Sequence, residues 1–129
     1  MSRKGTKAED YIYDCIKDYP ECKYRASEWV RTKMPRCPNY DDCDADPKDS
    51  LCLMVNIRDL MAVQGYVNKP TVHYYVTKLR NKEETVERIR VKRYLYRGRL
   101  RWVVDNGTHR VEAYRYLGKT EIPAVWGFD

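Results

Sequence analysis

The segment VVDNGTHRVEAYRYLGKTEIPAVW, residues 103–126, decides the fold of this chain. Its apolar run stops at Asp105-Asn106-Gly107 and resumes as an amphipathic stretch from about Thr108 to Leu117. Apolar side chains there recur at helical spacing, at Val111, Tyr114 and Leu117. Gly118 stands where a left-handed helix cap is expected, and residues 121–126 have the composition of a strand. The segment therefore predicts a strand, a tight junction, a helix and a closing strand.

The junction between strand and helix is the candidate functional site. A strand that passes directly into a helix leaves several first-turn amide groups unpaired, and together they attract anions. Gly107 allows a close approach of the backbone to a ligand, while His109 and Arg110 can supply side-chain donors. The predicted phosphate-binding residues are Asn106, Gly107, Thr108, His109 and Arg110. Asp105 and His109 are catalytic candidates, because Asp105 could position a metal or orient His109.

The same residues also fit a purely structural role. Asn106-Gly107 is typical of a tight turn, and Thr108 is a good helix N-cap. Junctions of this kind are common in proteins that bind nothing there. Local chemistry alone leaves the phosphate site and the turn with a cap as open alternatives.

A β-hairpin is predicted immediately before this segment. Residues 89–104 alternate twice between apolar and polar positions around a turn at Arg97-Gly98. One face carries cations interleaved with tyrosines: Arg90, Lys92, Tyr94, Tyr96 and Arg101. Arg90, Lys92 and Arg101 are the candidate nucleic-acid contacts, although a solvated hairpin face would have the same pattern.

Further upstream, two more elements precede the hairpin. The run LCLMVNI from Leu51 predicts a buried strand, and the following IRDLMAV could begin a helical turn. A helix is then predicted from four apolar residues at helical spacing, with Pro70 near its start: Val72, Tyr75, Val76 and Leu79.

The first 50 residues are predicted to form a separate, helical extension of the domain 51–129. Thr6 and Glu9 can form a capping box for a helix that ends at Pro20. A second helix is predicted from about Tyr24 to Pro35, on the spacing of Ala26, Trp29, Val30 and Met34. Residues 35–50 have no period and predict a loop.

All five cysteines lie in the first half of the chain, at positions 15, 22, 37, 43 and 52. Their spacing contains no CxxC pair, which disfavours zinc. Free thiols, one or two disulfides and a metal site all remain open. The loop from Cys37 to Cys43 is the place where a covalent or metal staple is most expected, because a long acidic loop has little else to fix it.

The overall composition limits the class of protein. The chain has 129 residues, a formal net charge of +6 and a sequence pI near 9.1, which favours polyanionic partners such as nucleotides or DNA. No signal peptide is recognisable, and no apolar run approaches the roughly 18 residues that a membrane helix needs. We therefore expect a cytoplasmic protein with no membrane partner.

Residues 51–129 resemble the N-terminal domain of ParB partition proteins and the wider ParB and sulfiredoxin superfamily. The resemblance depends on residues 104–110, on the helix 111–118 and on residues 120–125, which follow the superfamily pattern of DG-x-[HR]-R, a helix and IPV. It implies an α/β (α+β) fold with a small mixed sheet and packed helices. It also implies a nucleotide triphosphate, ATP or CTP with Mg²⁺, as the ligand.

The sequence departs from two branches of that superfamily and fits a third. Sulfiredoxins have a nucleophilic cysteine where this chain has Thr108, which argues against their activity. The GERR and ENxxR motifs of partition proteins are absent, as is a downstream helix-turn-helix. Related free-serine kinases read DGHHR, which Asp105, His109 and Arg110 fit.

Three functional hypotheses follow. The first is a ParB-like, nucleotide-binding and DNA-associated module. The second is a small nucleotide-dependent phosphotransferase, ATPase or nuclease of the same superfamily. The third is a catalytically silent interaction protein that has retained the fold.

Overall fold

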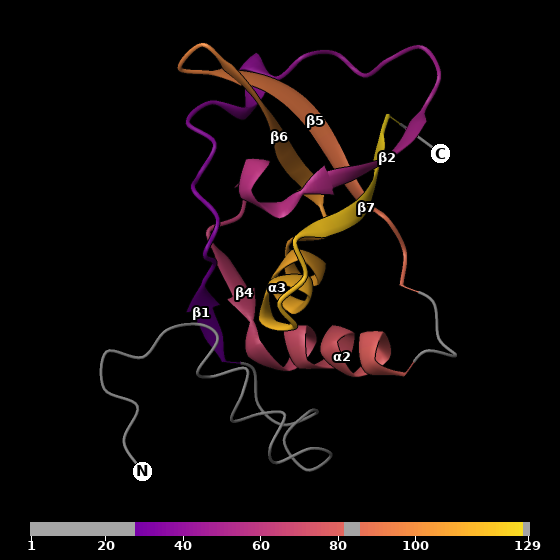
Figure 1. Cartoon of the computed structure of the whole chain (residues 1–129). Helices are drawn as coiled ribbons and strands as arrows, with labels where there is room; N and C mark the ends of the chain where they lie inside the picture. Colours follow the sequence, from indigo (N-terminus) through magenta and orange to yellow (C-terminus); the bar gives the residue numbers. More distant parts are fainter. Residues whose placement is uncertain (1–27, 82–85, 128–129) are drawn as a thin grey trace.

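The structure, a computed structural model, describes residues 28–81 and 86–127 (Figure 1). Its elements in chain order are β1 (Trp29–Arg31), η1 (Tyr40–Asp42), β2 (Leu51–Asn56), η2 (Ile57–Asp59), β3 (Leu60–Ala62), β4 (Tyr66–Asn68), α2 (Lys69–Arg80), β5 (Ile89–Tyr96), β6 (Arg99–Asn106), α3 (Thr108–Tyr116) and β7 (Glu121–Trp126). Within these residues, two α-helices and a small mixed sheet give an α+β fold, which confirms the predicted class.

A five-stranded sheet in the order β2-β7-β5-β6-β3 forms the body of the molecule. The hairpin of β5 and β6 is antiparallel, β7 runs parallel to β5, and β3 runs parallel to β6. The predicted hairpin is confirmed, including its turn, where Arg97 and Gly98 have φ of 53° and 76°. A second, two-stranded sheet pairs β1 with β4.

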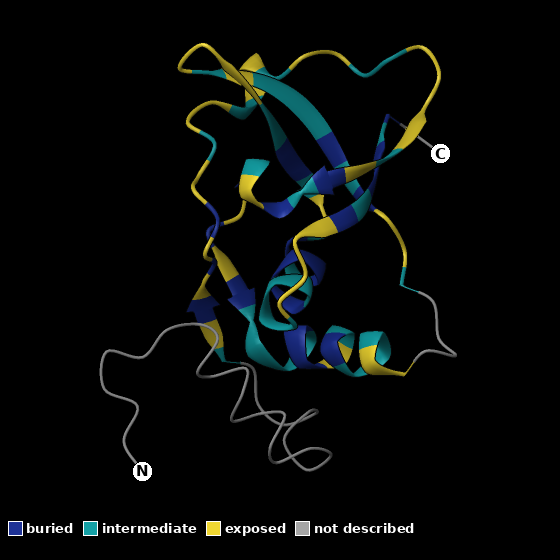
Figure 2. Ribbon diagram, in the orientation of Figure 1, coloured by how far each residue is buried: buried dark blue, intermediate teal, exposed yellow. Residues whose placement is uncertain are grey.

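The core is divided by α3, which lies between the large sheet and α2 (Figure 1). Val111 on α3 packs with the apolar sheet residues, whereas Ala113 packs with Val72 and Val76 of α2. Figure 2 shows the burial concentrated in α3, in the inner turns of α2 and at the end of the hairpin nearest to α3. The junction that begins α3 is therefore held from both sides.

The predicted helices of residues 51–129 are confirmed. Pro70 lies in the first turn of α2, where a missing amide hydrogen is tolerated. Gly118 follows α3 with φ of 77°, as a left-handed cap requires. The helical turn expected after residue 57 is the short η2, and residues 60–62 continue as a strand.

One strand is less buried than its sequence predicts. Leu51–Asn56 forms β2 as expected, but β2 is an edge strand that pairs on one side only, with β7. Leu51 and Met54 are each more than half exposed as a result. Apolar composition alone could not distinguish an edge strand from a central one.

The second predicted helix, residues 24–35, is wrong in its described part. Trp29–Arg31 is the strand β1, and it pairs with β4 so that Val30 enters the core against α2. A long-range strand partner thus overrides the local helical spacing. The predicted helix of residues 6–19 lies outside the described residues.

The segment that follows β1 packs against the five-stranded sheet. Arg36 bridges Ala62 of β3, and Met34 belongs to the main core. Within residues 28–50 the only helical element is the single turn η1, so this part of the predicted extension is not α-helical. Neither α2 nor α3 is long and apolar enough to cross a membrane.

Candidate functional site

Gly107 forms the junction between β6 and α3. Its φ is +120°, a conformation that residues with a side chain rarely adopt. A Cβ at this position would lie 2.5 Å from Cγ2 of Ile89, which is fully buried, and 3.2 Å from Cζ of Arg110. The backbone turn and the tight packing beneath it therefore both require glycine.

The N-terminus of α3 has no side-chain cap. Gly107 is its N-cap residue and Thr108 is the first residue of the helix, with no side-chain hydrogen bond closing the first turn. The alternative in which Thr108 caps the helix is therefore wrong. The amide groups of the first turn remain available to a ligand or to water, and the helix dipole adds positive potential at the same place.

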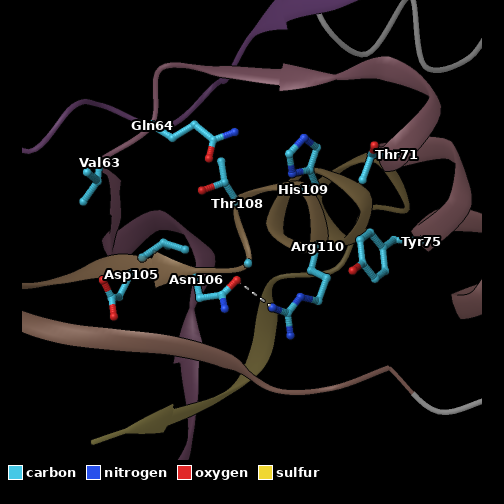
Figure 3. Close-up of a pocket in the computed structure, with 11 residues that line it drawn as sticks. Val63, Gln64, Thr71, Tyr75, Asp105, Asn106, Thr108, His109 and Arg110 are labelled. Atoms are coloured by element: carbon cyan, nitrogen blue, oxygen red, sulfur yellow. Dashed lines mark hydrogen bonds between the residues drawn. The ribbon is translucent and has the colours of Figure 1, made fainter. Parts of the chain in front are cut away.

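A pocket of about 210 Å³ lies at this N-terminus (Figure 3). It brings together all five residues of the predicted phosphate site, together with Asp105. The rest of its lining comes from β6, the segment after β3 and the helix α2: Val104, Val63, Gln64, Thr71 and Tyr75. Sequence reasoning missed the last four, because they reach the junction only through the pairing of β3 with β6 and the packing of α2 on α3.

Arg110 is anchored inside the protein. Its Nη1 donates to the carbonyl oxygens of Glu87 at 3.1 Å and Arg88 at 2.8 Å, and its Nη2 donates to Oδ1 of Asn106 at 3.3 Å. The residue is only 7% exposed, so this charged side chain is buried at the junction. These three bonds use three of the five N–H donors of the guanidinium. Arg110 thus lines the pocket and also holds residues 87–88, which lead directly into β5.

His109 is held as a neutral imidazole. Its Nε2 accepts a hydrogen bond from the backbone amide of Asn68 at 2.9 Å, which places the ring proton on Nδ1. The ring packs edge-on against Trp29, with centroids 6.1 Å apart. Burial lowers the pKa of His109, and the charge of Arg110 lowers it further. His109 therefore connects α3 to the start of α2.

This contact predicts a pH dependence of stability. The pKa of His109 is lowered in the folded state relative to its ordinary value of 6.5, so below about pH 6.5 the unfolded chain binds more protons. The contribution of His109 is complete above that pH, and it should be lost as the pH falls. Urea unfolding between pH 7.5 and 5 should show a smaller decline for His109→Gln than for the parent. Equal declines would contradict the assignment.

The polar partners of Asp105 among the described residues are Tyr40 and Arg90, and His109 is not among them. It accepts a hydrogen bond from the hydroxyl of Tyr40, and its Oδ2 lies 3.5 Å from Nη2 of Arg90. Burial raises the pKa of Tyr40, and the hydrogen bond to Asp105 raises it further, so the hydroxyl stays protonated. The described contacts therefore do not support Asp105 as the group that orients His109, which is held instead by Asn68.

The predicted nucleic-acid contacts on the hairpin each have an acidic or carbonyl partner. Arg90 pairs with Asp105, as described above, and Nζ of Lys92 lies 3.4 Å from Oδ1 of Asp46. Nε of Arg101 donates to the carbonyl of Asp59 at 3.2 Å. The loop that contains Asp46 therefore neutralises part of the face on which DNA binding was predicted.

Glu112 is a buried charge that sequence reasoning did not single out. It is 2% exposed, and its Oε2 accepts hydrogen bonds from the Thr32 hydroxyl and from the Lys33 amide, the latter at 2.9 Å. This carboxylate attaches the segment after β1 to α3. No local sequence pattern predicts this contact, because Thr32 and Lys33 lie about 80 residues before Glu112.

Within residues 28–81 and 86–127, no group of three or more His, Cys, Asp or Glu side chains is placed to hold a metal ion. No family model, curated protein or solved structure matches the chain. The resemblance to the ParB and sulfiredoxin superfamily therefore stays a prediction.

Proposed function

We propose that this protein binds a nucleotide through its phosphates at the N-terminus of α3. One observation carries the proposal: residues 106–110 line a single pocket at a helix start that has no side-chain cap. Unpaired first-turn amides and the positive end of the helix dipole favour an anion there. Asn106 and Arg110 add polar groups to the same wall.

A second cavity supports a nucleotide rather than a free phosphate as the ligand. It measures about 330 Å³ and shares Tyr75 and Arg110 with the first pocket. Tyr74 lines it as well, with its ring 5.1 Å from that of Tyr75 and 5.2 Å from Nζ of Lys78. Aromatic rings beside cations are suited to stacking on a base. We place the nucleoside in this cavity and the phosphates in the first.

Arg110 belongs to both cavities. Its guanidinium is oriented by the carbonyls of Glu87 and Arg88, and two N–H donors remain beyond the three described bonds. A phosphate between the two cavities could accept from those donors. The fixed orientation lowers the ordering cost of binding.

The proposal agrees with the resemblance to ParB-like proteins, which implies ATP or CTP with Mg²⁺. Association with DNA remains a further proposal, and the pairing of Arg90 and Lys92 with carboxylates does not strengthen it. A phosphotransferase is the second candidate, because Asp105 and His109 lie in the same pocket as the proposed phosphates.

Calorimetry with ATP, CTP, GTP, ADP and inorganic phosphate, each with and without Mg²⁺, tests the proposal. Asn106→Asp preserves the shape of the side chain and its contact with Arg110, but it adds a negative charge at the pocket. We expect this variant to weaken binding at least about tenfold, equivalent to about 1.4 kcal/mol. Asn56→Asp is the matched control, because it adds the same charge at the cap of η2, where aspartate is equally suited.

The remaining outcomes separate the hypotheses. Tyr74→Ala should weaken nucleotide binding while leaving phosphate binding unchanged, since Tyr74 lines only the second cavity. Product analysis after incubation then distinguishes a binding module, which leaves the nucleotide intact, from a phosphotransferase or an ATPase. If the parent chain binds none of these ligands, the proposal is wrong and an interaction protein without a nucleotide site is favoured.

A further inference from the structure

Two cysteines that line neither of the nucleotide cavities lie near each other in one loop. Cys37 and Cys43 lie in the loop between β1 and β2, and both are free and partly buried. Cys37 lies close enough to Cys43 to contribute to the raised pKa of the Cys43 thiol. The two thiols are therefore neighbours in this loop while both are reduced.

The backbone holds both residues of this pair in place. The amide of Cys37 donates to the carbonyl of Ala62 in β3 at 2.8 Å, and the amide of Asp44 donates to the carbonyl of Arg93 in β5 at 2.8 Å. Between them, η1 closes through the amide of Cys43, which donates to the carbonyl of Tyr40 at 3.1 Å. The loop is thus attached to two strands of the sheet at its two ends, and its turn brings the cysteines together.

The side chains of the loop support the same turn. Oδ1 of Asn39 accepts from the amide of Asp41 at 3.1 Å, and its Nδ2 donates to Asp42 at 2.9 Å. Asp44 and Asp46 are paired with Arg93 and Lys92 of β5. Little chain entropy remains to oppose a covalent bond between the two thiols, because the loop already has the closed shape.

We propose that Cys37 and Cys43 are a redox-active pair that closes into an intramolecular disulfide when the protein meets a low-molecular-weight disulfide. This site is independent of the proposed nucleotide function. It requires only an oxidant of the glutathione disulfide class.

The reaction balances as a pair of thiol–disulfide exchanges. The sulfur of Cys37, as its thiolate, attacks the oxidant, forms a mixed disulfide and releases one reduced thiol. Cys43 then loses its proton, its sulfur attacks the Cys37 sulfur, and the second reduced thiol leaves. The protein gives up two protons and two electrons, and the oxidant becomes two thiols.

The order of the two steps follows from the environment of Cys43. Burial raises the pKa of Cys43 to about 12, and the neighbouring Cys37 contributes to the shift. Cys43 therefore stays protonated beside Cys37 at neutral pH, and we assign the first attack to Cys37. Cys43 becomes nucleophilic only when Cys37 has formed the mixed disulfide.

Closure would also fix Tyr40, which lies between the two cysteines in sequence. The hydroxyl of Tyr40 donates to Asp105, one of the residues that line the first pocket. In the oxidised protein this contact would be held by a covalent ring, whereas in the reduced protein it depends on the hydrogen bonds of the loop.

Mass spectrometry of the full chain after treatment with glutathione disulfide tests the pair. Trypsin should release residues 37–48 as one peptide, because no Lys or Arg lies between Cys37 and Lys48. We expect this peptide to lose two hydrogens on oxidation and to regain them with a reductant. The melting temperature of the oxidised protein should also exceed that of the reduced protein.

Two variants make the result specific. Cys43→Ser should leave Cys37 as a mixed disulfide with glutathione, and no internal bond should form. Cys52→Ser, at an exposed free thiol of β2, should leave the loss of two hydrogens unchanged. The proposal is overturned if the parent peptide carries two glutathiones, stays fully alkylatable, or is cross-linked to another cysteine of the chain.

Discussion

Gly107→Ala should lower the free energy of unfolding by about 2–5 kcal/mol, the combined cost of a strained backbone and an overpacked site. The added Cβ would face Ile89 at 2.5 Å and 2.9 Å, and both of those atoms belong to a fully buried side chain. Neither the backbone of the junction nor the core beneath it can move without disturbing α3. Urea denaturation of the variant and the parent measures the loss.

Gly118→Ala is the matched control for this substitution. Gly118 has φ of 77°, but a Cβ there would meet nothing within 4 Å, so only the backbone strain remains. We expect the control to cost about 1–2 kcal/mol. A Gly107→Ala variant that loses no more than Gly118→Ala would show that Ile89 moves aside easily, and it would contradict the tight packing inferred for the junction.

Arg110→Ala should reduce both stability and nucleotide binding. The substitution removes three hydrogen bonds from a side chain that is 7% exposed and leaves Asn106 and the carbonyls at residues 87–88 without their donor. We expect a loss of about 2–4 kcal/mol in the free energy of unfolding. The sequence alone predicts that folding survives this substitution with little loss, and the burial of Arg110 changes that expectation. Nucleotide affinity should fall about ten- to a hundredfold.

Two further variants separate these effects. Arg110→Lys keeps the charge but not the planar fork, so it should recover part of the binding and little of the stability. Arg99→Ala removes a surface arginine whose side chain is 68% exposed and pairs with Asp59, and it should cost about 0–1 kcal/mol. If Arg110→Ala proves as stable as Arg99→Ala, the carbonyl contacts contribute little, and Arg110 should be assigned to ligand binding alone.

From residue 51 onward, the strand β2, the helices α2 and α3, the hairpin and the strand β7 could be predicted because their signals are local, whereas the short strands β3 and β4 were not predicted. The hairpin follows from alternation around Arg97-Gly98, and α3 follows from its spacing and from Gly118. The residues of the proposed phosphate site could be grouped for the same reason, since all five are consecutive in sequence. Their gathering around one pocket requires only the turn at Gly107.

What the sequence could not supply depends on distant partners. The strand β1 has only three residues, and its flanking sequence has helical spacing, so only the pairing with β4 identifies it. The burial of Arg110 depends on the carbonyls at residues 87–88, and that of Glu112 depends on Thr32 and Lys33. Local composition contains none of this information, because each contact requires the assembled fold.

The position of β7 in the sheet has a consequence for synthesis on the ribosome. β7 follows every other strand in the chain, yet it lies between β2 and β5 in the order of the sheet. β2 therefore has no partner until residues 121–126 leave the exit tunnel, about 65 residues after β2 itself. During that interval an apolar strand that contains Leu51 and Met54 is exposed to other nascent chains. The hairpin and α3 can form earlier from local contacts, whereas completion of the sheet waits for the final strand.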